Sequence, residues 1–371
     1  TSTIMVDANG DGLDDMIVAA PNADPGGRVD AGAVYVTFGT RNIFTEPLDP
    51  TLLNGTNGFV IEGIAAGDQL GIALAVGDMN GDTLEDLAIG APGANTGAGQ
   101  IAVIFGGSGT WPATVDPEDL VGSTGVNGTN GILLDGVSAG NRTGSALSFG
   151  DMNGDNINDL SIGAPGANSL AGVVYIVFGS NTTWTGFTPV DLALLDGNTG
   201  VNGTGGMRIN GTSTGESGTA LTHCDVNADG LNDTIFGAPK AQAFGFNSAG
   251  RTYAVFGKTS GWTATMTVTA LDGSNGFYDG GAANGHHSGS ALACGDVNGD
   301  GLPDLIIGAP NTNTTGTGNG SVYVHYGKLG AWAASTYLND LRHNIDGYRL
   351  DGGNGEHAGK AVAAGPDVNG D

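Results

Sequence analysis

The chain has 371 residues, of which 70 are glycine, 38 are acidic and only 11 are lysine or arginine, giving a formal net charge of −27. This balance excludes a nucleic-acid-binding protein, which needs clustered cations to neutralise phosphates, and argues against docking on anionic membranes. Yet 39% of the residues are hydrophobic and evenly spread, which a disordered acidic polymer would lack. The composition therefore predicts a folded, turn-dense, all-β protein.

One acidic pattern recurs along the chain. The run Asp-x-Asn-(Gly/Ala)-Asp begins at six positions spaced 71 to 74 residues apart, which are Asp7, Asp78, Asp151, Asp225, Asp296 and Asp367. A fixed period of this length indicates a repeat architecture. We expect one repeat region over residues 1–371, with units at about 1–70, 71–143, 144–217, 218–288 and 289–358, and residues 359–371 starting a truncated unit.

Within each unit the expected elements follow one order. A strand of small residues, such as Gly289 to Gly295, enters the acidic loop, and a short apolar strand leaves it. That second strand ends at a Gly-Ala-Pro turn, such as Gly308-Ala309-Pro310, which in the first unit is Ala19-Ala20-Pro21. A third, alternating strand closes on an aromatic residue and glycine, such as Phe38-Gly39, and an extended segment such as Gly58 to Gly63 ends the unit.

A second aromatic residue follows five positions after each aromatic-glycine pair. The equivalent residues are Phe44, Trp111, Trp184, Trp262 and Trp332. All four tryptophans of the chain share this position, which indicates a packing anchor for each unit rather than a ligand-stacking surface.

Four short strands per unit, with turn signals between them and no sustained helical period, predict an all-β fold of four-stranded blades, that is, a β-propeller. Small side chains suit the strand beside the central axis. A parallel β-solenoid is disfavoured because its turns repeat every 20–30 residues. We find no apolar run near the ~18 residues that a membrane span needs, and no signal peptide.

The acidic loops have the donor pattern of a calcium site. Side-chain oxygens fall at loop positions 1, 3, 5 and 9, and the backbone carbonyl of position 7 can add a fifth ligand. Converging hard oxygens without nitrogen or sulfur suit Ca²⁺. The predicted ligands of about five sites are Asp7, Asn9, Asp11, Leu13 and Asp15; Asp78, Asn80, Asp82, Leu84 and Asp86; Asp151, Asn153, Asp155, Ile157 and Asp159; Asp225, Asn227, Asp229, Leu231 and Asp233; and Asp296, Asn298, Asp300, Leu302 and Asp304.

Position 6 needs a positive φ for the sharp turn and is Gly12, Thr83, Asn156, Gly230 and Gly301 in chain order. β-Branched Thr83 should be strained there, which predicts a weaker second site. Asp367, Asn369 and Asp371 begin a sixth loop that the chain end cuts off. The alternative, solvated Asx-turns without metal, is disfavoured because five complete copies share one register.

These aromatic-glycine closures, Gly-Ala-Pro turns and acidic loops together resemble the FG-GAP repeat of the integrin α-subunit β-propeller. The resemblance covers essentially the whole chain. It implies a propeller with Ca²⁺ in the hairpins, on an extracellular or cell-surface protein. Family propellers usually have seven blades, whereas five repeats occur here. We therefore expect a piece of a longer array rather than five blades closing with a spare strand; open ends could also be completed by a neighbouring chain.

No catalytic motif stands out. Two G-x-S-x-G matches, at residues 136–140 and 211–215, lie in the same inter-strand turn of two repeats and lack the strand-to-helix turn of a nucleophile elbow. We expect a solvated loop pair at His286 and His287. Cys224 and Cys294 precede consecutive acidic loops, and the sequence leaves open whether they form a disulfide or two buried thiols.

The leading hypothesis is a non-enzymatic extracellular calcium-binding β-propeller for adhesion or surface binding, whose partner is an extracellular protein or glycan. One alternative is a structural subunit of a glycosylated filament assembled head-to-tail by self-association. Another is an accessory propeller of a larger secreted hydrolase. N-glycosylation sequons occur at Asn54, Asn127, Asn141, Asn181, Asn202, Asn210, Asn232, Asn313 and Asn319.

Overall fold

The computed structural model describes residues 2–41, 49–109, 111–118, 131–181, 190–193, 205–313, 318–343 and 345–365. The chain divides into two compact units. The first comprises residues 1–149, 156–160 and 177–200, and the second comprises 150–155, 161–176 and 201–371. This division does not follow the 72-residue repeats, because its boundary passes through the third repeat.

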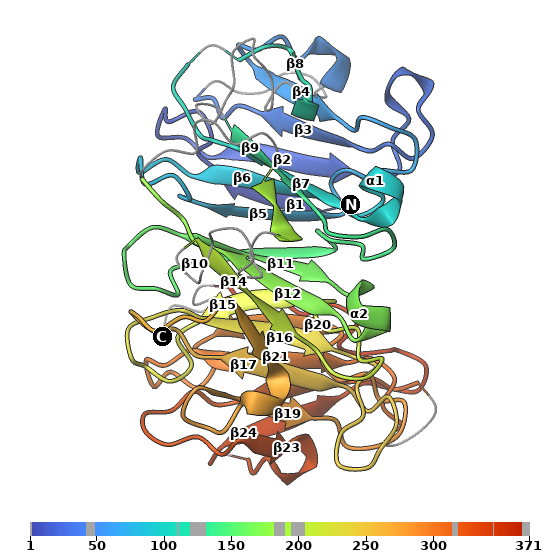
Figure 1. Ribbon diagram of the computed structural model, residues 1–371, viewed down its shortest axis with the longest axis vertical. Helices are drawn as coiled ribbons and strands as arrows, with labels where there is room; N and C mark the ends of the chain where they lie inside the picture. The colour runs from blue at the N-terminus through green and yellow to red at the C-terminus, as the bar shows by residue number, and fades with distance from the viewer. Residues whose placement is uncertain are drawn as a thin grey trace. The chain divides into compact units, whose positions relative to one another are not determined.

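The described chain forms five sheets (Figure 1). The first has the order β1 (Thr3–Val6), β2 (Asp15–Ala20), β3 (Ala33–Thr37), β4 (Gly58–Glu62), β8 (Thr114–Val115). The second has β5 (Ala73–Gly77), β6 (Asp86–Ala91), β7 (Gln100–Ile104), β9 (Gly131–Asp135), β13 (Val190–Asp191). The third has β10 (Ala146–Gly150), β11 (Asp159–Ala164), β12 (Val173–Val177), β14 (Gly206–Asn210), β18 (Thr265–Thr267).

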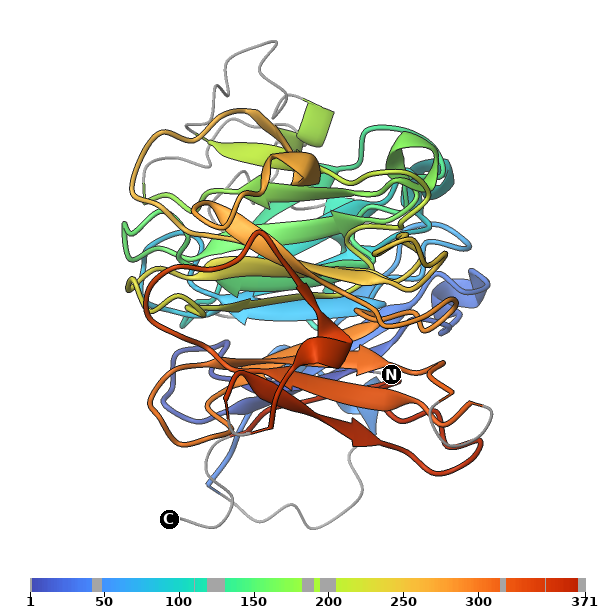
Figure 2. The ribbon, with the colours of Figure 1, turned by 90° about the horizontal axis from the view of Figure 1, so that it is seen from below.

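The two remaining sheets lie in the second unit and appear in yellow to red in Figure 2. The fourth has the order β15 (Leu221–Cys224), β16 (Asp233–Ala238), β17 (Arg251–Val255), β19 (Gly276–Gly280), β23 (Ser335–Tyr337). The fifth has β20 (Ala291–Gly295), β21 (Asp304–Ala309), β22 (Ser321–His325), β24 (Gly347–Asp351). Helical turns are short, namely α1 (Ala94–Gly97), α2 (Ala167–Leu170), η1 (Pro25–Gly27), η2 (Pro50–Leu52), η5 (Val268–Ala270) and η6 (Leu338–Asp340).

The all-β prediction is confirmed, and the four strands of each repeat form one sheet as expected of a propeller blade. The first four sheets also carry a fifth strand that the sequence did not predict. It comes from the following repeat and runs parallel to the fourth strand, as where Val60 pairs with Thr114 and Tyr278 with Ser335. Neighbouring repeats therefore share strands.

The aromatic residue that follows each aromatic-glycine pair explains how this fifth strand is held. Trp111 stacks on Phe59 of the preceding repeat, with ring centroids 4.5 Å apart, and Trp332 stacks on Phe277 at 4.3 Å. These two tryptophans are packing anchors, as predicted, but each anchors its repeat to the previous one. Trp184 and Phe44 lie outside the described residues.

The cores lie between consecutive sheets. In the first unit Ile17 and Val34 of the first sheet pack in one cluster with Leu87 and Ile89 of the second. In the second unit Ile235 and Phe277 of the fourth sheet share a cluster with Leu305, Ile307 and Tyr323 of the fifth. Each internal sheet therefore buries both faces, which is why its second strand is apolar throughout rather than alternating.

Glycine in the Gly-Ala-Pro turn is required by a close backbone approach. A Cβ added to Gly90 would lie 2.1 Å from the carbonyl oxygen of Gly144, and one added to Gly237 would lie 1.9 Å from that of Gly289. The chain of the next repeat passes against the turn at these points, so no side chain fits there.

A disulfide joins the last two repeats. Cys224 ends β15 and Cys294 lies on β20, and their Cα atoms are 6.3 Å apart. The sequence left this pairing open. In the described part of the chain, no helix is both long and apolar enough to span a membrane.

Candidate metal centre

Each acidic loop connects the first and second strands of a sheet. In the first hairpin Val6 pairs with Asp15, and in the fifth Gly295 pairs with Asp304. The loop therefore starts directly after the first strand, and its ninth residue opens the second strand. This places all candidate ligands of one copy in one tight hairpin, as the sequence predicted.

The acidic side chains hold the loop in shape by accepting backbone hydrogen bonds. Asp7 accepts from the amides of Asp11 at 3.0 Å and Gly12 at 2.8 Å, through its two oxygens. Asn9 Oδ1 accepts from Asp11 N at 2.9 Å, and Asp11 Oδ1 accepts from Leu13 N at 2.9 Å. The second, fourth and fifth loops repeat this pattern at equivalent residues.

Two residues of each loop adopt left-handed backbone angles. Position 6 has a positive φ in every copy, as predicted, including 74° at Thr83. Position 4 does too, with 73° at Gly10 and 58° at Ala228, and the sequence analysis missed this second requirement. Thr83 carries the steric cost expected of a β-branched residue in this region.

The ninth aspartate has a structural role that the sequence analysis also missed. It is 0% exposed in all five copies, which are Asp15, Asp86, Asp159, Asp233 and Asp304. Asp304 Oδ2 accepts from Val297 N and Oδ1 from Gly327 N, both at 2.9 Å. The second donor is the glycine of the aromatic-glycine pair, and the same bond forms at Gly39, Gly106, Gly179 and Gly257. The sequence signal for this bond is that the ninth aspartate and the aromatic-glycine pair occur together in every repeat.

Burial changes the acidity of this aspartate. Desolvation raises the pKa of Asp86 to about 7 and that of Asp233 to about 8, although two backbone amides lower each pKa and partly oppose the rise. Burial likewise raises the pKa of Asp15 and of Asp304. Nearby loop carboxylates add to the rise in all four. A cation bound in the loop would favour the ionised form instead.

The loops are also tied to the next repeat. The carbonyl of loop position 2 accepts the amide N–H of the residue after the next aromatic-glycine pair, as from Gly107 to Ala8 at 3.1 Å and from Lys328 to Val226 at 3.1 Å. In addition, Asn232 Oδ1 accepts from Asp151 N at 3.0 Å. Because the loop contacts its neighbour through its backbone, its conformation and the packing between repeats are coupled.

The donor set fits a hard cation. Each loop offers two carboxylates and an amide oxygen at positions 1, 3 and 5, a carbonyl at position 7 and the buried carboxylate at position 9. Each oxygen of that buried carboxylate uses one lone pair on an amide, which leaves another. Among the described residues, no three His, Cys, Asp or Glu side chains group closely enough to hold a metal ion. Asp367, Asn369 and Asp371 lie outside the described residues.

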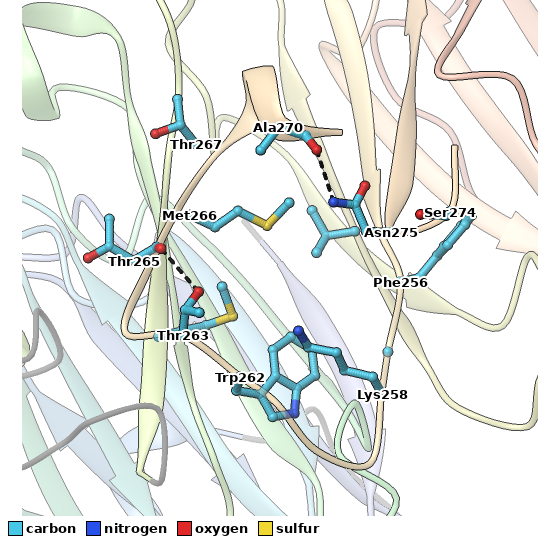
Figure 3. Close-up of a pocket in the computed structure, with 13 residues that line it drawn as sticks. Phe256, Lys258, Trp262, Thr263, Thr265, Met266, Thr267, Ala270, Ser274 and Asn275 are labelled. Carbon is cyan, nitrogen blue, oxygen red and sulfur yellow. Dashed lines mark hydrogen bonds between the residues drawn. The ribbon is translucent and has the colours of Figure 1, made fainter. Parts of the chain in front are cut away.

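A cavity of about 440 Å³ in the second unit was not foreseen from the sequence (Figure 3). It lies where Met207 takes the place of the phenylalanine that stacks on tryptophan in the first and fourth repeats. Polar groups at its wall already bond within their own turns: Asn275 Nδ2 donates to Ala270 O at 2.9 Å, and Thr263 Oγ1 donates to Thr265 O at 3.1 Å. Lys258 Nζ donates to Gly261 O at 2.8 Å and Ser274 Oγ to Asp272 Oδ1 at 2.7 Å. Because these polar groups have partners nearby and Phe256, Trp262 and Met266 supply apolar wall, we interpret the cavity as a packing gap.

The two remaining sequence features are the histidine pair and the G-x-S-x-G matches, and neither forms a catalytic site among the described residues. His286 is only 8% exposed, and its carbonyl accepts from Asn311 N of the fifth repeat. The prediction of a solvated histidine pair is therefore wrong for His286. Ser138 and Ser213, the centres of the G-x-S-x-G matches, are exposed and lie in the turns after β9 and β14. No described helix follows either serine directly.

Comparison with known proteins identifies a matching repeat family and several relatives. The FG-GAP repeat model matches residues 1–37, 70–104, 143–177 and 288–325. Phosphatidylinositol-glycan-specific phospholipase D of Homo sapiens is 31% identical over 193 residues, which is 50% of this chain and 20% of that protein.

Integrin subunits match as well. Integrin alpha-PS5 of Drosophila melanogaster is 34% identical over 171 residues, covering 46% of this chain and 15% of that protein. Integrin alpha pat-2 of Caenorhabditis briggsae is 28% identical over 246 residues, covering 65% and 18%. The chain thus spans about a fifth or less of the length of these relatives.

Proposed function

Because the chain is built of FG-GAP repeats, we propose that it is a non-catalytic, calcium-stabilised binding scaffold on an extracellular or cell-surface protein. The observation that carries this proposal is the repetition of one loop with the same oxygen pattern in five hairpins, the first four of which are bonded through their backbone to the next repeat. Relatives among integrin subunits support an extracellular location.

In this proposal the side chains at positions 1, 3 and 5 and the carbonyl of position 7 supply the accessible ligands. The ninth aspartate closes the set through the lone pairs that its amide bonds leave free. The ion supplies positive charge that offsets repulsion among three carboxylates in one loop. Holding the loop in turn holds position 2 against the next repeat, so that calcium stabilises the packing of repeats.

Chelation tests this directly. Thermal unfolding of the chain should shift to markedly lower temperature in EDTA and return when Ca²⁺ is added in excess. Isothermal titration of the metal-free chain should give about five equivalents of Ca²⁺. An unfolding midpoint that is the same with EDTA and with Ca²⁺ would overturn the metal proposal.

The partner of the scaffold is an extracellular protein or glycan, or another array of the same repeats. An accessory role beside a secreted hydrolase is the second candidate, favoured by the phospholipase D relatives, of which the chain matches only 20% of the human protein. The reading frame of the whole gene separates these roles. A hydrolase domain in that frame favours the accessory role, and its absence favours the adhesion scaffold.

A further inference from the structure

The fourth repeat has an aromatic hairpin in the connection between β16 and β17, where the other repeats have no aromatic residue. Ala243 and Phe246 pair through two backbone hydrogen bonds, of 3.1 and 2.8 Å, across the turn residues Phe244 and Gly245. Both turn residues have a positive φ, 50° at Phe244 and 87° at Gly245, as in a type I′ turn, which favours asparagine followed by glycine. Phenylalanine is therefore an unfavourable residue at position 244, yet its side chain is 42% exposed.

A glycine in the neighbouring strand matches this hairpin. The last residue of the strand equivalent to β19 is polar in the other four repeats, where it is Glu62, Asp135, Asn210 or Asp351. Two of these carboxylates accept side-chain hydrogen bonds, from Arg28 and from Gln100. In the fourth repeat the residue is Gly280, and a Cβ added there would lie 2.4 Å from Cε2 of Phe244. The Phe244 ring therefore covers the backbone at a place where the other repeats have a polar side chain.

Phe244 belongs to a group of four exposed or partly exposed rings, which we name the aromatic platform and which also contains Phe246, Tyr278 and Tyr337. The centroid of the Phe244 ring lies 5.8 Å from that of Tyr278 and 5.3 Å from that of Tyr337, and Phe246 stacks on Tyr337 at 6.5 Å. The Tyr337 hydroxyl donates to Ala282 O at 2.8 Å, which fixes its ring. Because β23 of the fifth repeat already completes the fourth sheet beside it, the platform lies within the repeat series rather than at its end.

Charges near the platform disfavour an ionic ligand. The guanidinium of Arg251 lies 4.3 Å from the centroid of the Tyr278 ring, so a second cation would meet a like charge there. Lys240, which lies on the same connection as the hairpin, is paired with Glu216 at 3.0 Å. The net charge of −27 would repel an anionic ligand. A neutral ligand fits these conditions best.

Exposed amides next to the platform favour a ligand rich in hydroxyl groups. Gln242 and Asn247 lie on the connection that carries the hairpin, and Asn284 Oδ1 accepts from Asn247 N at 2.7 Å. All three side chains are exposed, and each amide both donates and accepts, as hydroxyl groups do. A hydrophobic peptide would bury these amides without partners. A sugar ring can instead set its C–H face on an aromatic ring and its hydroxyls against the amides.

From these observations we propose that the aromatic platform binds a neutral sugar ring of an extracellular glycan. Phe244 is the stacking residue, and the amides of Gln242, Asn247 and Asn284 hydrogen-bond the hydroxyls. The inference rests on the proposed scaffold role and deepens it by naming the chemical class of the partner and the place where it binds. It also explains the strained turn, because the unfavourable backbone angle at Phe244 presents an aromatic face to the ligand.

Isothermal titration of the full chain in Ca²⁺ with neutral hexasaccharides of glucose, mannose, galactose and N-acetylglucosamine tests the proposal. At least one of them should bind with a Kd below about 1 mM. Phe244→Asn should weaken that binding by about tenfold or more without lowering the unfolding temperature, because asparagine suits the turn. Phe244→Tyr should retain binding. Leu170→Asn is the matched control, because Leu170 lies in the same connection of the third repeat, is 43% exposed and has a φ of 70°.

Three outcomes would overturn the proposal: no binding of any of the four hexasaccharides, equal binding by the parent and Phe244→Asn, or binding of an apolar peptide but of no sugar. A sialylated oligosaccharide that binds more tightly than every neutral one would also overturn it. If Phe244→Asn unfolds, Phe244→Gly replaces it, since glycine suits the same backbone angles. Thermal unfolding with EDTA and with Ca²⁺ is measured on the same samples. Calcium-dependent unfolding without sugar binding would refute this inference alone, whereas calcium-independent unfolding would refute the metal proposal.

Discussion

The ninth aspartate of each acidic loop joins two parts of a repeat that are 20 to 24 residues apart in sequence. Its carboxylate receives one amide from the loop and one from the Phe-Gly turn. Only a carboxylate can accept both without presenting a donor to one of them. This explains why aspartate, rather than asparagine, stands at position 9 in every copy, whereas position 3 is asparagine throughout.

Asp304→Asn tests this role. The new amide has one acceptor and one donor end, so either Val297 N or Gly327 N loses its bond. We expect the free energy of unfolding at pH 8 to fall by about 2 kcal/mol, in EDTA as well as in Ca²⁺. Asp300→Asn, at exposed position 5, should mainly reduce the gain from Ca²⁺. Equal and purely calcium-dependent losses in both variants would contradict the structural role.

A largely enclosed histidine, with a partly exposed side chain, is expected to make the protein sensitive to acid. His223 Nε2 lies 3.1 Å from Ser161 Oγ and 3.0 Å from Thr234 Oγ1. Desolvation lowers the pKa of His223 from 6.5 to about 3. The folded state therefore binds fewer protons than the unfolded state between these values. Its stability is intact above pH 6.5 and is lost as the pH falls below it.

His223→Gln should remove this dependence. Between pH 6.5 and pH 5 the unfolding free energy of the parent should fall by about 2 kcal/mol more than that of the variant. Denaturant unfolding at several pH values in constant Ca²⁺ measures it, with His343→Gln as an exposed control. A difference between parent and variant that is the same at both pH values would show that His223 does not titrate in this way.

At the residue scale the sequence predicted the loops, their ligand pattern and the positive φ at position 6, because these depend on local spacing. It missed the bonds of position 9 and the burial of His286, because both depend on segments that meet only after the sheets pack. The metal ligands themselves stay a prediction. The disulfide between Cys224 and Cys294 was undecided for the same reason, since spacing alone does not fix which strands become neighbours.

At the element scale, the fifth strand and the aromatic stack act together to attach each repeat to the previous sheet. Trp111 and Trp332 each precede the short strand that joins the previous sheet, and each ring lies nearly parallel to a phenylalanine, at 9° and 7°. Four strands per repeat could be read from turn signals and alternation. The fifth could not, because two or three residues without a clear period give no signal of their own.

The Met207 cavity provides a natural test of the stack. Met207→Phe should let a ring face Trp262 and fill part of the cavity of about 440 Å³, raising the free energy of unfolding by about 1 kcal/mol. The reverse change, Phe277→Met, should lower it by at least as much, because Phe277 is 0% exposed against Trp332. Thermal unfolding of both variants measures the pair. Destabilisation by both changes would mean that Met207 is already well packed.

At the scale of the whole molecule, a large share of the negative charge lies in the acidic loops. Each of the five complete loops has three of the 38 acidic residues at predicted ligand positions 1, 5 and 9. Since each bound Ca²⁺ adds two positive charges, five ions would change the net charge from −27 to −17. Much of the acidity is then concentrated at hairpins rather than spread as a solubility coat, which the composition alone could not reveal.

The disulfide lies wholly in the second compact unit, so the two units should respond differently to reduction. It closes a loop with a sequence separation of 70 residues. Reduction should therefore destabilise the second unit by about 2–4 kcal/mol and leave the first unchanged. Calorimetry with and without reductant measures this. The double variant Cys224→Ala/Cys294→Ala is the control and should show no further response to reductant. A single transition that shifts as a whole would contradict independent units.

Strand sharing between repeats also sets the order in which the chain can fold during synthesis. The first sheet begins at Thr3 and is completed only by Thr114–Val115. A ribosome must therefore release about half of the second repeat before the first sheet has all its strands. The second, third and fourth sheets also wait for a strand of the following repeat, so while these sheets form, the nascent chain carries an unfinished sheet edge that the next segment to be made will cover.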